Sequence, residues 1–250
     1  MGDSENGRVA IVTGGSRGIG RAIAERLAAD GQSVVIAYAR NDAEADATVA
    51  AVGAAGGAAI AVRADVADEA AVDALFAAAE REFGGVDVVV NAAGIMVLAP
   101  IAEFDLDALD RMHRTNIRGT FVVAQQAARR VRSGGAIINL STSVKKLGLP
   151  GYGPYAASKG AVDAISLILA KELEGRDITV NAVAPGPTAT ALFLEGKDEA
   201  TIERLAHMNP IGRLGTPDDI AEAVSFLAGP GRWINGQVVY VNGGMIGTAG

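Results

Sequence analysis

Tyr155 and Lys159 are the residues whose types and spacing point most directly to chemistry. They lie four residues apart in GYGPYAASKGA (151–161), so on a helix that begins near Pro154 they share one face. A free phenol has a pKa of about 10 and is a poor acid–base group at neutral pH. A nearby ammonium favours the phenolate, so we expect Lys159 to lower the pKa of Tyr155 for general acid–base catalysis. The alternative is an aromatic residue and a lysine on a surface helix, because Y-x-x-x-K matches are common by chance.

Hydroxyl and amide side chains follow two segments that read as buried strands. The run Ser-Thr-Ser (141–143) comes directly after AIINL, and NAAG (91–94) comes directly after VDVVV. Carboxyl ends of parallel strands meet at one edge of a sheet, where open α/β sheets bind ligands. Asn116 lies in a predicted helix within RTNIRGT. A buried amide there implies a hydrogen-bonding role, with helix–helix packing as the alternative.

A glycine-rich loop joins the first predicted strand to the first predicted helix. The segment reads TGGSRGIG (13–20), and an alanine-rich stretch follows it. Gly14, Gly18 and Gly20 let the backbone turn tightly, approach a pyrophosphate and pack the helix against the strand. The helix N-terminus adds free N–H groups and a positive dipole for the anion. Because the loop follows the first strand of a βαβ unit, we expect a dinucleotide site rather than an ordinary glycine turn.

The residues after the second predicted strand favour NADP(H) over NAD(H). A carboxylate there would bind the adenosine 2′-OH, but this chain has Tyr38 and Arg40. Arg40 and Arg17 can pair with a 2′-phosphate, whereas solvated surface charges are the alternative. We expect the following Asp42 to cap the next helix.

Short apolar runs alternate with helical stretches along the chain. The runs read as strands at 8–13, 33–38, 59–64, 86–90, 136–140, 178–184 and 237–242. The stretches read as helices at 18–30, 42–55, 68–82, 105–131, 154–174 and 217–228. This alternation predicts an α/β fold with a Rossmann-type, doubly wound, parallel seven-stranded sheet and helices on both faces. We expect one domain over 1–250, with the poorly fitting segment 190–216 as a substrate lid.

The bulk composition narrows the class of protein. The chain has 250 residues, no cysteine and a formal charge of −7, so it has no disulfides or cysteine-bound metals, and generic nucleic-acid binding is not expected. Its first 15 residues lack a signal-peptide pattern, and no apolar run reaches the roughly 18 residues of a membrane helix. We therefore expect a soluble, cytoplasmic protein without a membrane partner or a metal site.

Taken together, these motifs resemble those of the short-chain dehydrogenase/reductase family, in its single-domain branch of about this length. The resemblance covers nearly all of 8–244 and rests on TGGSRGIG, NAAG, the Asn of RTN, the hydroxyl run, YAASK, NAVAPGPTAT and YVNGG. Within the family the chain is similar to 3-oxoacyl-ACP (acyl carrier protein) reductases and to polyhydroxynaphthalene or quinone-type ketoreductases.

The resemblance implies a role for each matching residue. Tyr155 would protonate the carbonyl oxygen, Lys159 would lower its pKa and bind the nicotinamide ribose, and Asn116 would hold a water in a proton relay. Asp65 and Val66 match the adenine-binding pair, and the segment from Pro185 to Thr190 matches the part that seats the nicotinamide carboxamide. The full set of implied cofactor-binding residues is Gly14, Ser16, Arg17, Gly18, Ile19, Gly20, Tyr38, Arg40, Asp65, Val66, Asn91, Ala92, Gly94, Tyr155, Lys159, Pro185, Gly186, Thr188 and Thr190.

One position departs from the family pattern. The family usually has Ser thirteen residues before the tyrosine, and counting back from Tyr155 gives Thr142, flanked by Ser141 and Ser143. Threonine can donate the same hydrogen bond, although its methyl group restricts χ1. We expect Thr142, ahead of Ser143, to polarise the substrate carbonyl.

The resulting expectation is an NADPH-dependent reductase of a small carbonyl compound. Ile95–Val97, the loop 144–152 and the lid residues Leu192 and Phe193 are largely apolar and favour a medium apolar or aromatic substrate. The alternatives are an alcohol or sugar dehydrogenase that works in the oxidative direction and a non-catalytic dinucleotide sensor. The resemblance implies a homotetramer, or a dimer, through helices 105–131 and 154–174. A cationic cluster could dock an acyl carrier protein, but a solvated helix end is the preferred interpretation: Arg129, Arg130 and Arg132.

Overall fold

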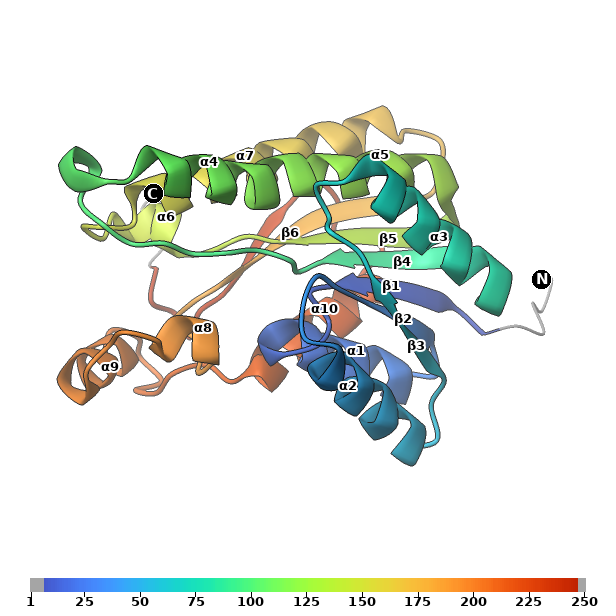
Figure 1. The fold of residues 1–250 in the computed structure, drawn as a ribbon, viewed down its shortest axis with the longest axis horizontal. Coiled ribbons are helices and arrows are strands. Elements are labelled where there is room, and N and C mark those ends of the chain that lie inside the picture. Colours follow the sequence, from blue (N-terminus) through green and yellow to red (C-terminus); the bar gives the residue numbers. More distant parts are fainter. Residues whose placement is uncertain (1–6, 247–250) are drawn as a thin grey trace.

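A seven-stranded parallel sheet forms the centre of the computed structural model, which describes residues 7–246 (Figure 1). The strands follow the order β3-β2-β1-β4-β5-β6-β7, and every neighbouring pair is parallel. Their bounds are β1 (Val9–Thr13), β2 (Ser33–Tyr38), β3 (Ala59–Arg63), β4 (Val86–Asn91), β5 (Val131–Leu140), β6 (Thr179–Pro185) and β7 (Val238–Val241). The predicted doubly wound fold is confirmed. The chain start used for the signal-peptide expectation and both ends of the expected domain lie partly outside the described residues.

Helices cover both faces of the sheet. Figure 1 shows α3, α5 and α7 on one face and α1, α2 and α10 on the other. The bounds are α1 (Gly18–Ala29), α2 (Asp42–Ala54), α3 (Glu69–Phe83), α4 (Leu106–His113), α5 (Gly119–Arg130), α6 (Val144–Leu147), α7 (Gly153–Glu172), α8 (Ala191–Leu194), α9 (Glu199–Ala206) and α10 (Pro217–Ala228). None of the helices within this described part of the chain has the length and apolarity to cross a membrane.

The sheet explains the near-continuous apolar runs of the sequence. β1 and β4 are buried at every position, since each strand has helices above and below it. One core cluster joins the sheet to α3, α5 and α7, and a second joins it to α1 and α10. Burying each large aliphatic side chain is worth roughly 1.5–3 kcal/mol, so the sheet is a rigid platform for its carboxyl edge.

The strand order places a crevice at that edge. β1 pairs with β2 on one side and with β4 on the other, so the strand order reverses at β1. The chain leaves β1 toward α1 on one face and leaves β4 toward α4 on the other. The resulting divergence beside Thr13 and Asn91, which are paired in register, is where such sheets bind ligands.

Two expected elements differ from the observed ones. The predicted helix 105–131 is divided into α4, a π-helical turn η2 (Arg114–Arg118) and α5, and β5 already begins at Val131. The spacing of apolar residues does not distinguish a π turn from an α-helix, because one inserted residue barely changes the helical periodicity. The segment 190–216 contains two short helices, α8 and α9, which Figure 1 places at the edge of the molecule.

Candidate active site

The face of α7 toward the sheet carries Tyr155 and Lys159. The helix begins at Gly153 with Pro154 in its first turn, where the missing N–H costs no helical hydrogen bond. Lys159 is buried, and its Nζ donates to the Leu140 carbonyl at 2.7 Å. The same Nζ lies 6.0 Å from the centroid of the Tyr155 ring. The structure therefore places both groups beside the end of β5, as the i, i+4 spacing predicts.

The pKa values of this pair differ from the expectation. Burial raises the pKa of Tyr155 to about 12, Tyr152 adds to the rise, and a hydrogen bond from Thr142 opposes it. Burial lowers the pKa of Lys159 to about 8. The prediction that Lys159 lowers the pKa of Tyr155 is wrong here. Loss of hydration dominates, and the ammonium gives its hydrogen bond to Leu140 rather than to the phenol.

The three hydroxyls after β5 have different partners. Ser141 donates to Asp163 Oδ1 at 2.6 Å, and Ser143 donates to the Ala184 carbonyl at 2.9 Å. Both serines are buried, whereas Thr142 is partly accessible and is the one that contacts Tyr155. The two serine hydroxyls thus tie β5 to α7 and β6, and Thr142 is left facing the phenol.

Asn116 joins three elements at the base of the site. It lies in η2 and is completely buried. Its side chain accepts from the Ile95 N–H and donates to the Ile95 carbonyl, each at 2.9 Å, and it donates to Ser158 Oγ at 3.0 Å. A Cβ on Gly94 would lie 3.3 Å from Asn116 Oδ1 and 3.5 Å from Lys159 Nζ. The segment after β4, η2 and α7 therefore meet at one place, where a side chain at position 94 would crowd Asn116.

The glycine loop forms a cradle that a side chain would fill. Gly14 and Gly18 have φ values of 64° and 53°, which favour glycine. A Cβ on Gly20 would lie 2.1 Å from the Gly14 carbonyl oxygen, so α1 packs directly on the turn. The N-terminus of α1 at Arg17 has no side-chain cap and no acidic residue in its first turn. These features fit a dinucleotide pyrophosphate. Ser16 belongs to the same loop, where Thr48 donates to its carbonyl, and Ile19 lies in the first turn of α1.

The end of β4 lies beside this cradle. Thr13 donates to Asn91 Oδ1 at 2.8 Å and accepts from the Ala93 N–H. A Cβ on Gly14 would lie within 3.2 Å of the backbone of Ala92 and Ala93. The predicted cofactor residues of the two loops therefore meet across the point where the strand order reverses.

The residues predicted to bind the adenine end of the cofactor agree with the prediction only in part. Arg17 and Arg40 are both exposed. Asn41, with φ of 67°, accepts from the Glu44 N–H and caps α2, so the prediction that Asp42 is the cap is wrong. Asp42 is the first residue of α2, and its hydrogen bond with Tyr38 raises the pKa of that phenol.

The expected adenine pair has partners within the protein. Asp65 forms an ion pair with Arg114 at 2.7 Å and accepts from the Ala67 N–H. These hydrogen bonds hold the pKa of its carboxyl below the usual value against the opposing effect of desolvation, and Arg40 lowers it further. Val66 is buried against Gly119. Asp65 thus reaches the Arg40 side of the crevice, whereas the Val66 side chain faces the core.

The segment after β6 reaches the glycine loop. A Cβ on Gly18 would lie 3.5 Å from Thr190 Cγ2, and Thr190 caps α8. Pro185 ends β6, a Cβ on Gly186 would lie 2.9 Å from Asn242, and Thr188 donates to the Gly186 carbonyl. The structure therefore brings 185–190, the cradle and the Tyr155 cluster to one edge of the sheet.

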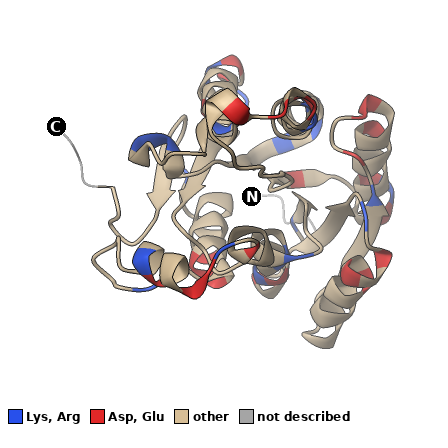
Figure 2. Cartoon of the chain, turned by 60° about the vertical axis from the view of Figure 1, so that its left-hand side comes forward, with Lys and Arg blue, Asp and Glu red and all other residues tan. Residues whose placement is uncertain are grey.

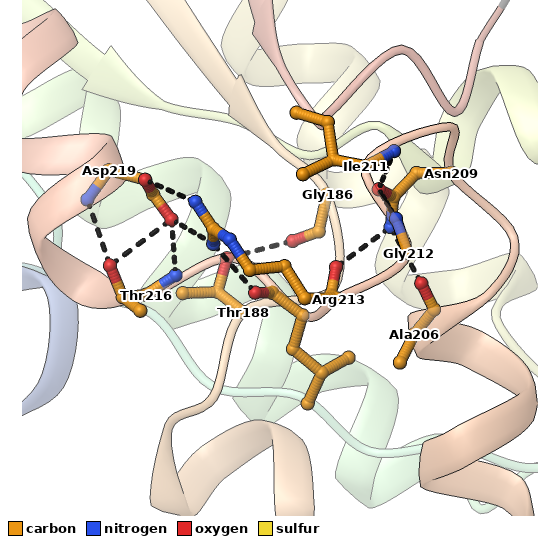
Figure 3. Close-up of polar contacts among 10 residues, drawn as sticks. Gly186, Thr188, Ala206, Asn209, Ile211, Gly212, Arg213, Thr216 and Asp219 are labelled. Atoms are coloured by element: carbon orange, nitrogen blue, oxygen red, sulfur yellow. Dashed lines mark hydrogen bonds and ion pairs between the residues drawn. The ribbon is translucent and has the colours of Figure 1, made fainter.

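Two polar groups fix the base of the segment 190–216 (Figure 3). Buried Asn209 donates to the carbonyls of Ala206 and Arg213 and accepts from the N–H groups of Ile211 and Gly212. Because the four hydrogen bonds close a turn, this end of the segment has one conformation at its base.

The second group is an ion pair with α10. Arg213 contacts Asp219 through two hydrogen bonds of 2.6 and 3.0 Å, and Asp219 also accepts from the Thr216 N–H in a capping box. Thr188 forms a bridge with Gly215, which ties the start of the segment to its end. No sequence signal marks the ion pair, because it depends on where the loop returns to α10, whereas the Asn209 hydrogen bonds are all made within four residues.

The cationic cluster at the end of α5 is mostly paired. Arg130 contacts Asp73 and Glu80, and Arg132 contacts Asp87 at 2.5 Å. Figure 2 shows basic and acidic segments interspersed along the helices rather than separated into single-sign faces. The preferred interpretation of a solvated helix end therefore describes the cluster better than a carrier-protein dock.

Two ionisable residues of the site were not predicted from the sequence. Asp163 lies four residues after Lys159, and Lys145 lies in α6. Their side chains form an ion pair of 2.7 Å beside Ser141. The helical spacing after Lys159 could have identified Asp163, but Lys145 has no such signal. Among residues 7–246, no group of three His, Asp or Glu side chains is arranged to hold a metal ion.

Comparisons with known proteins find similar reductases and dehydrogenases. A family model described as enoyl-(acyl carrier protein) reductase matches residues 14–246. The chain is 43% identical to an NADPH-dependent aldehyde reductase-like, chloroplastic protein of Arabidopsis thaliana, over 96% of this chain and 94% of the relative. It is 40% identical to a versicolorin reductase of Emericella nidulans, over 98% and 99% of the two chains.

A solved structure is similar along the same length. It is a short chain dehydrogenase from Burkholderia cenocepacia in complex with NADP, with a TM-score of 0.90 and 40% sequence identity. The match covers 96% of this chain and 98% of that one.

Proposed function

The chain belongs to the short-chain dehydrogenase/reductase family and is an NAD(P)-dependent oxidoreductase, and from that premise we propose that it reduces a ketone or aldehyde with NADPH. The observation that carries this proposal is the cluster at the carboxyl edge, in which partly accessible Thr142 and buried Lys159 flank partly accessible Tyr155. When bound, the dinucleotide supplies a hydride to the carbonyl carbon, and the protein supplies the proton.

The state of Tyr155 favours reduction over oxidation. With a pKa of about 12, the phenol is protonated at neutral pH, as a proton donor must be, and it gives up its proton as negative charge develops on the carbonyl oxygen. Alcohol oxidation needs the phenolate, which burial disfavours. Thr142, which lies beside the phenol, would donate its one O–H to the same carbonyl oxygen.

Lys159 and Asn116 support the proton donor in different ways. The Lys159 ammonium, held by Leu140, is placed to donate to the nicotinamide ribose. The Asn116 amide is bonded to Ile95 and Ser158, so it fixes the wall of the site next to Gly94. The resemblance implies that Asn116 holds a water in a proton relay. Because its side chain is already hydrogen-bonded, that water would bind to the backbone next to Asn116.

The preference for NADPH rests on the arginines at the adenine end. Arg17 at the N-terminus of α1 and Arg40 after β2 are both exposed cations. A 2′-phosphate between them would form charge-assisted hydrogen bonds, whereas NADH would leave both unpaired. The NADP complex of the Burkholderia cenocepacia relative supports this assignment.

We propose a medium-sized apolar or aromatic carbonyl compound as the substrate. Val97 and Leu192 are exposed apolar side chains on the two segments expected to border the pocket. The names of the versicolorin reductase and the aldehyde reductase-like relative fit this class. Residues 190–216 would close over the substrate as the lid of a single domain, 1–250.

Exposed apolar side chains also support a homotetramer, with a dimer as the smaller alternative. Phe121 on α5 and Leu167 and Ile168 on α7 are about half exposed, on the two helices expected to pair between subunits. Light scattering at micromolar concentration tests this, and a monomer would contradict it. The expected cytoplasmic location stays a prediction, since the Arabidopsis thaliana relative is named as chloroplastic.

A cofactor-by-substrate panel tests the function. NADPH and NADH oxidation would be followed with a β-ketoacyl thioester, an enoyl thioester, an aromatic polyketone, an aldehyde and a keto sugar. We expect NADPH-dependent turnover of a carbonyl compound. Arg17→Ala and Arg40→Ala should raise the KM for NADPH with little effect on that for NADH.

Three outcomes would contradict the proposal. Turnover with NADH in place of NADPH would favour the NAD-preferring oxidative dehydrogenase, and tight NADPH binding without any turnover would favour a sensor. Turnover of the enoyl thioester alone would move the reaction from C=O to C=C reduction.

A further inference from the structure

A second lysine and a carboxylate form an ion pair behind the proposed proton donor. Lys145 Nζ on α6 contacts Asp163 Oδ2 on α7 at 2.7 Å. The two side chains are only 13% and 21% exposed, so the pair is largely shielded from water. An ion pair so buried is not explained as an ordinary surface contact.

The pair is part of a network that holds Ser141. Ser141 donates to Asp163 Oδ1 at 2.6 Å, and Lys145 contacts the same hydroxyl. Ser141 immediately follows Leu140, whose carbonyl accepts from Lys159, and it immediately precedes Thr142. One network therefore fixes the strand end that positions both the Lys159 ammonium and the Thr142 hydroxyl.

The pair also lies in the electrostatic surroundings of Lys159. Asp163 follows Lys159 by one helical turn on α7, and Lys145 faces it from α6. The Lys145 charge lowers the pKa of Lys159, and the Asp163 charge raises it. Burial lowers the pKa of Lys145 itself, and Asp163 opposes that change. The charged residues that act on Lys159 are thus balanced against each other.

We propose that Lys145 and Asp163 are positioning residues for Lys159, because they fasten the turn after β5 to α7 and set equal and opposite charges beside the ammonium. This inference rests on the proposed reductase function for its kinetic part only. Neither residue touches the reacting atoms, so each acts through Lys159 and Thr142.

The two partners should have opposite effects when each is neutralised. Lys145→Met leaves Asp163 as an uncompensated anion, which keeps Lys159 protonated to higher pH. Asp163→Asn leaves Lys145 as an uncompensated cation, which makes Lys159 lose its proton at lower pH. The double variant Lys145→Met/Asp163→Asn removes both charges and should titrate near the wild type.

A lysine NMR titration of the protein without cofactor provides a readout that does not depend on turnover. With ¹³C-labelled lysine, the Lys159 signal is identified by its loss in Lys159→Met and followed from neutral to alkaline pH. We expect its midpoint to rise by about one pH unit in Lys145→Met and to fall in Asp163→Asn. Lys171→Met, on an exposed part of α7, is the matched control and should leave the midpoint unchanged.

The pH dependence of kcat supplies the second readout. In each variant, the pH at which kcat falls on the alkaline side should move in the same direction as the midpoint of the Lys159 NMR titration. The KM for NADPH should change less than kcat. Lys145→Arg should restore the wild-type limb. If Asp163→Asn does not fold, which its melting curve would reveal, the upward shift in Lys145→Met still tests the proposal.

Two results would overturn it. One is a Lys159 midpoint that stays fixed in both single variants, and the other is a shift in the same direction in both. Failure of the proposed function is distinguishable, because the wild type would then turn over no carbonyl compound while the NMR shifts remain.

Discussion

The α7 strip, made of Tyr155, Lys159 and Asp163, and the proposed lid, residues 190–216, are built in opposite ways. Lys159 is buried, and both Lys159 and Asp163 have fixed hydrogen-bond partners. In the lid, α8 has no buried residue and α9 has only Leu205. The lid is fastened at its base, by Asn209 and by Arg213 with Asp219, rather than along its length.

From this difference we infer that the strip positions the groups that react and that the proposed lid controls which substrate binds. A proton donor must stay within a few tenths of an ångström of its working position, and a buried network supplies that rigidity. A lid must open for substrate and close over it, so it needs a firm base and few buried contacts. Changes in the strip should therefore alter kcat, and changes in the lid should alter KM.

The largest expected effect comes from removing the proton donor. Tyr155→Phe should lower kcat by at least roughly 10²-fold, because a positioned general acid contributes about 10²–10⁴-fold. The ring and its burial are retained, so NADPH affinity and the melting temperature should change little. Steady-state kinetics, fluorescence titration with NADPH and a melting curve measure the three quantities. Near-wild-type turnover would remove Tyr155 from the mechanism.

The next effect distinguishes the hydroxyls within the site. Thr142→Val keeps the shape but removes the donor next to Tyr155, so kcat should fall by about 10²-fold. Ser143→Ala is the matched control, since its hydroxyl is bonded to Ala184 and Asn242 and not to Tyr155. It should cost about 1 kcal/mol of stability with little loss of kcat. The reverse pattern would assign carbonyl polarisation to Ser143.

The features that could be predicted from the sequence are those that depend on local sequence patterns. Strand positions followed from apolar runs, because burial on both faces leaves a direct mark on composition. The Tyr155–Lys159 spacing and the glycine loop were readable, since each works through local backbone geometry. Asp163 continues the same helical spacing and was predictable in principle.

Other features depend on long-range placement and left no local mark. Whether Lys159 lowers the pKa of Tyr155 depends on burial and on the Leu140 carbonyl, 19 residues away in sequence. Lys145 becomes part of the site only because α6 folds onto α7. Tertiary contacts, not propensity, determine both features.

A smaller effect is expected at the base of the lid. Arg213→Met removes the ion pair with Asp219 and the hydrogen bond to the Leu214 carbonyl. The lid should then close less often, so the substrate KM should rise severalfold while kcat changes less. Arg81→Met, an exposed arginine on α3 far along the chain from the lid, is the control. A fall in kcat with an unchanged KM would mean that the lid contributes to the chemical step.

The smallest effect concerns pH. Hydrogen bonds from Arg213 and Thr216 hold the pKa of the Asp219 carboxyl well below its usual range. A carboxyl with a lowered folded-state pKa adds stability that is complete above its unfolded value of about 3.9 and is lost as pH falls toward the folded value. Asp219→Asn should therefore lower the free energy of unfolding by no more than about 1 kcal/mol at pH 7, because the pair is partly exposed.

The pH dependence of the difference in unfolding free energy between wild type and Asp219→Asn tests the Arg213–Asp219 ion pair. The gap between wild type and Asp219→Asn in denaturant unfolding should be constant from pH 7 to pH 5 and should shrink only below about pH 4. Asp218→Asn changes the neighbouring carboxylate in the first turn of α10, which makes none of the Arg213 contacts, and should show a smaller gap at pH 7. A gap that already closes between pH 7 and pH 5 would mean that Arg213 does not hold Asp219 ionised. The lid would then be fastened by Asn209 alone, and the contrast with the α7 strip would be greater than the structure indicates.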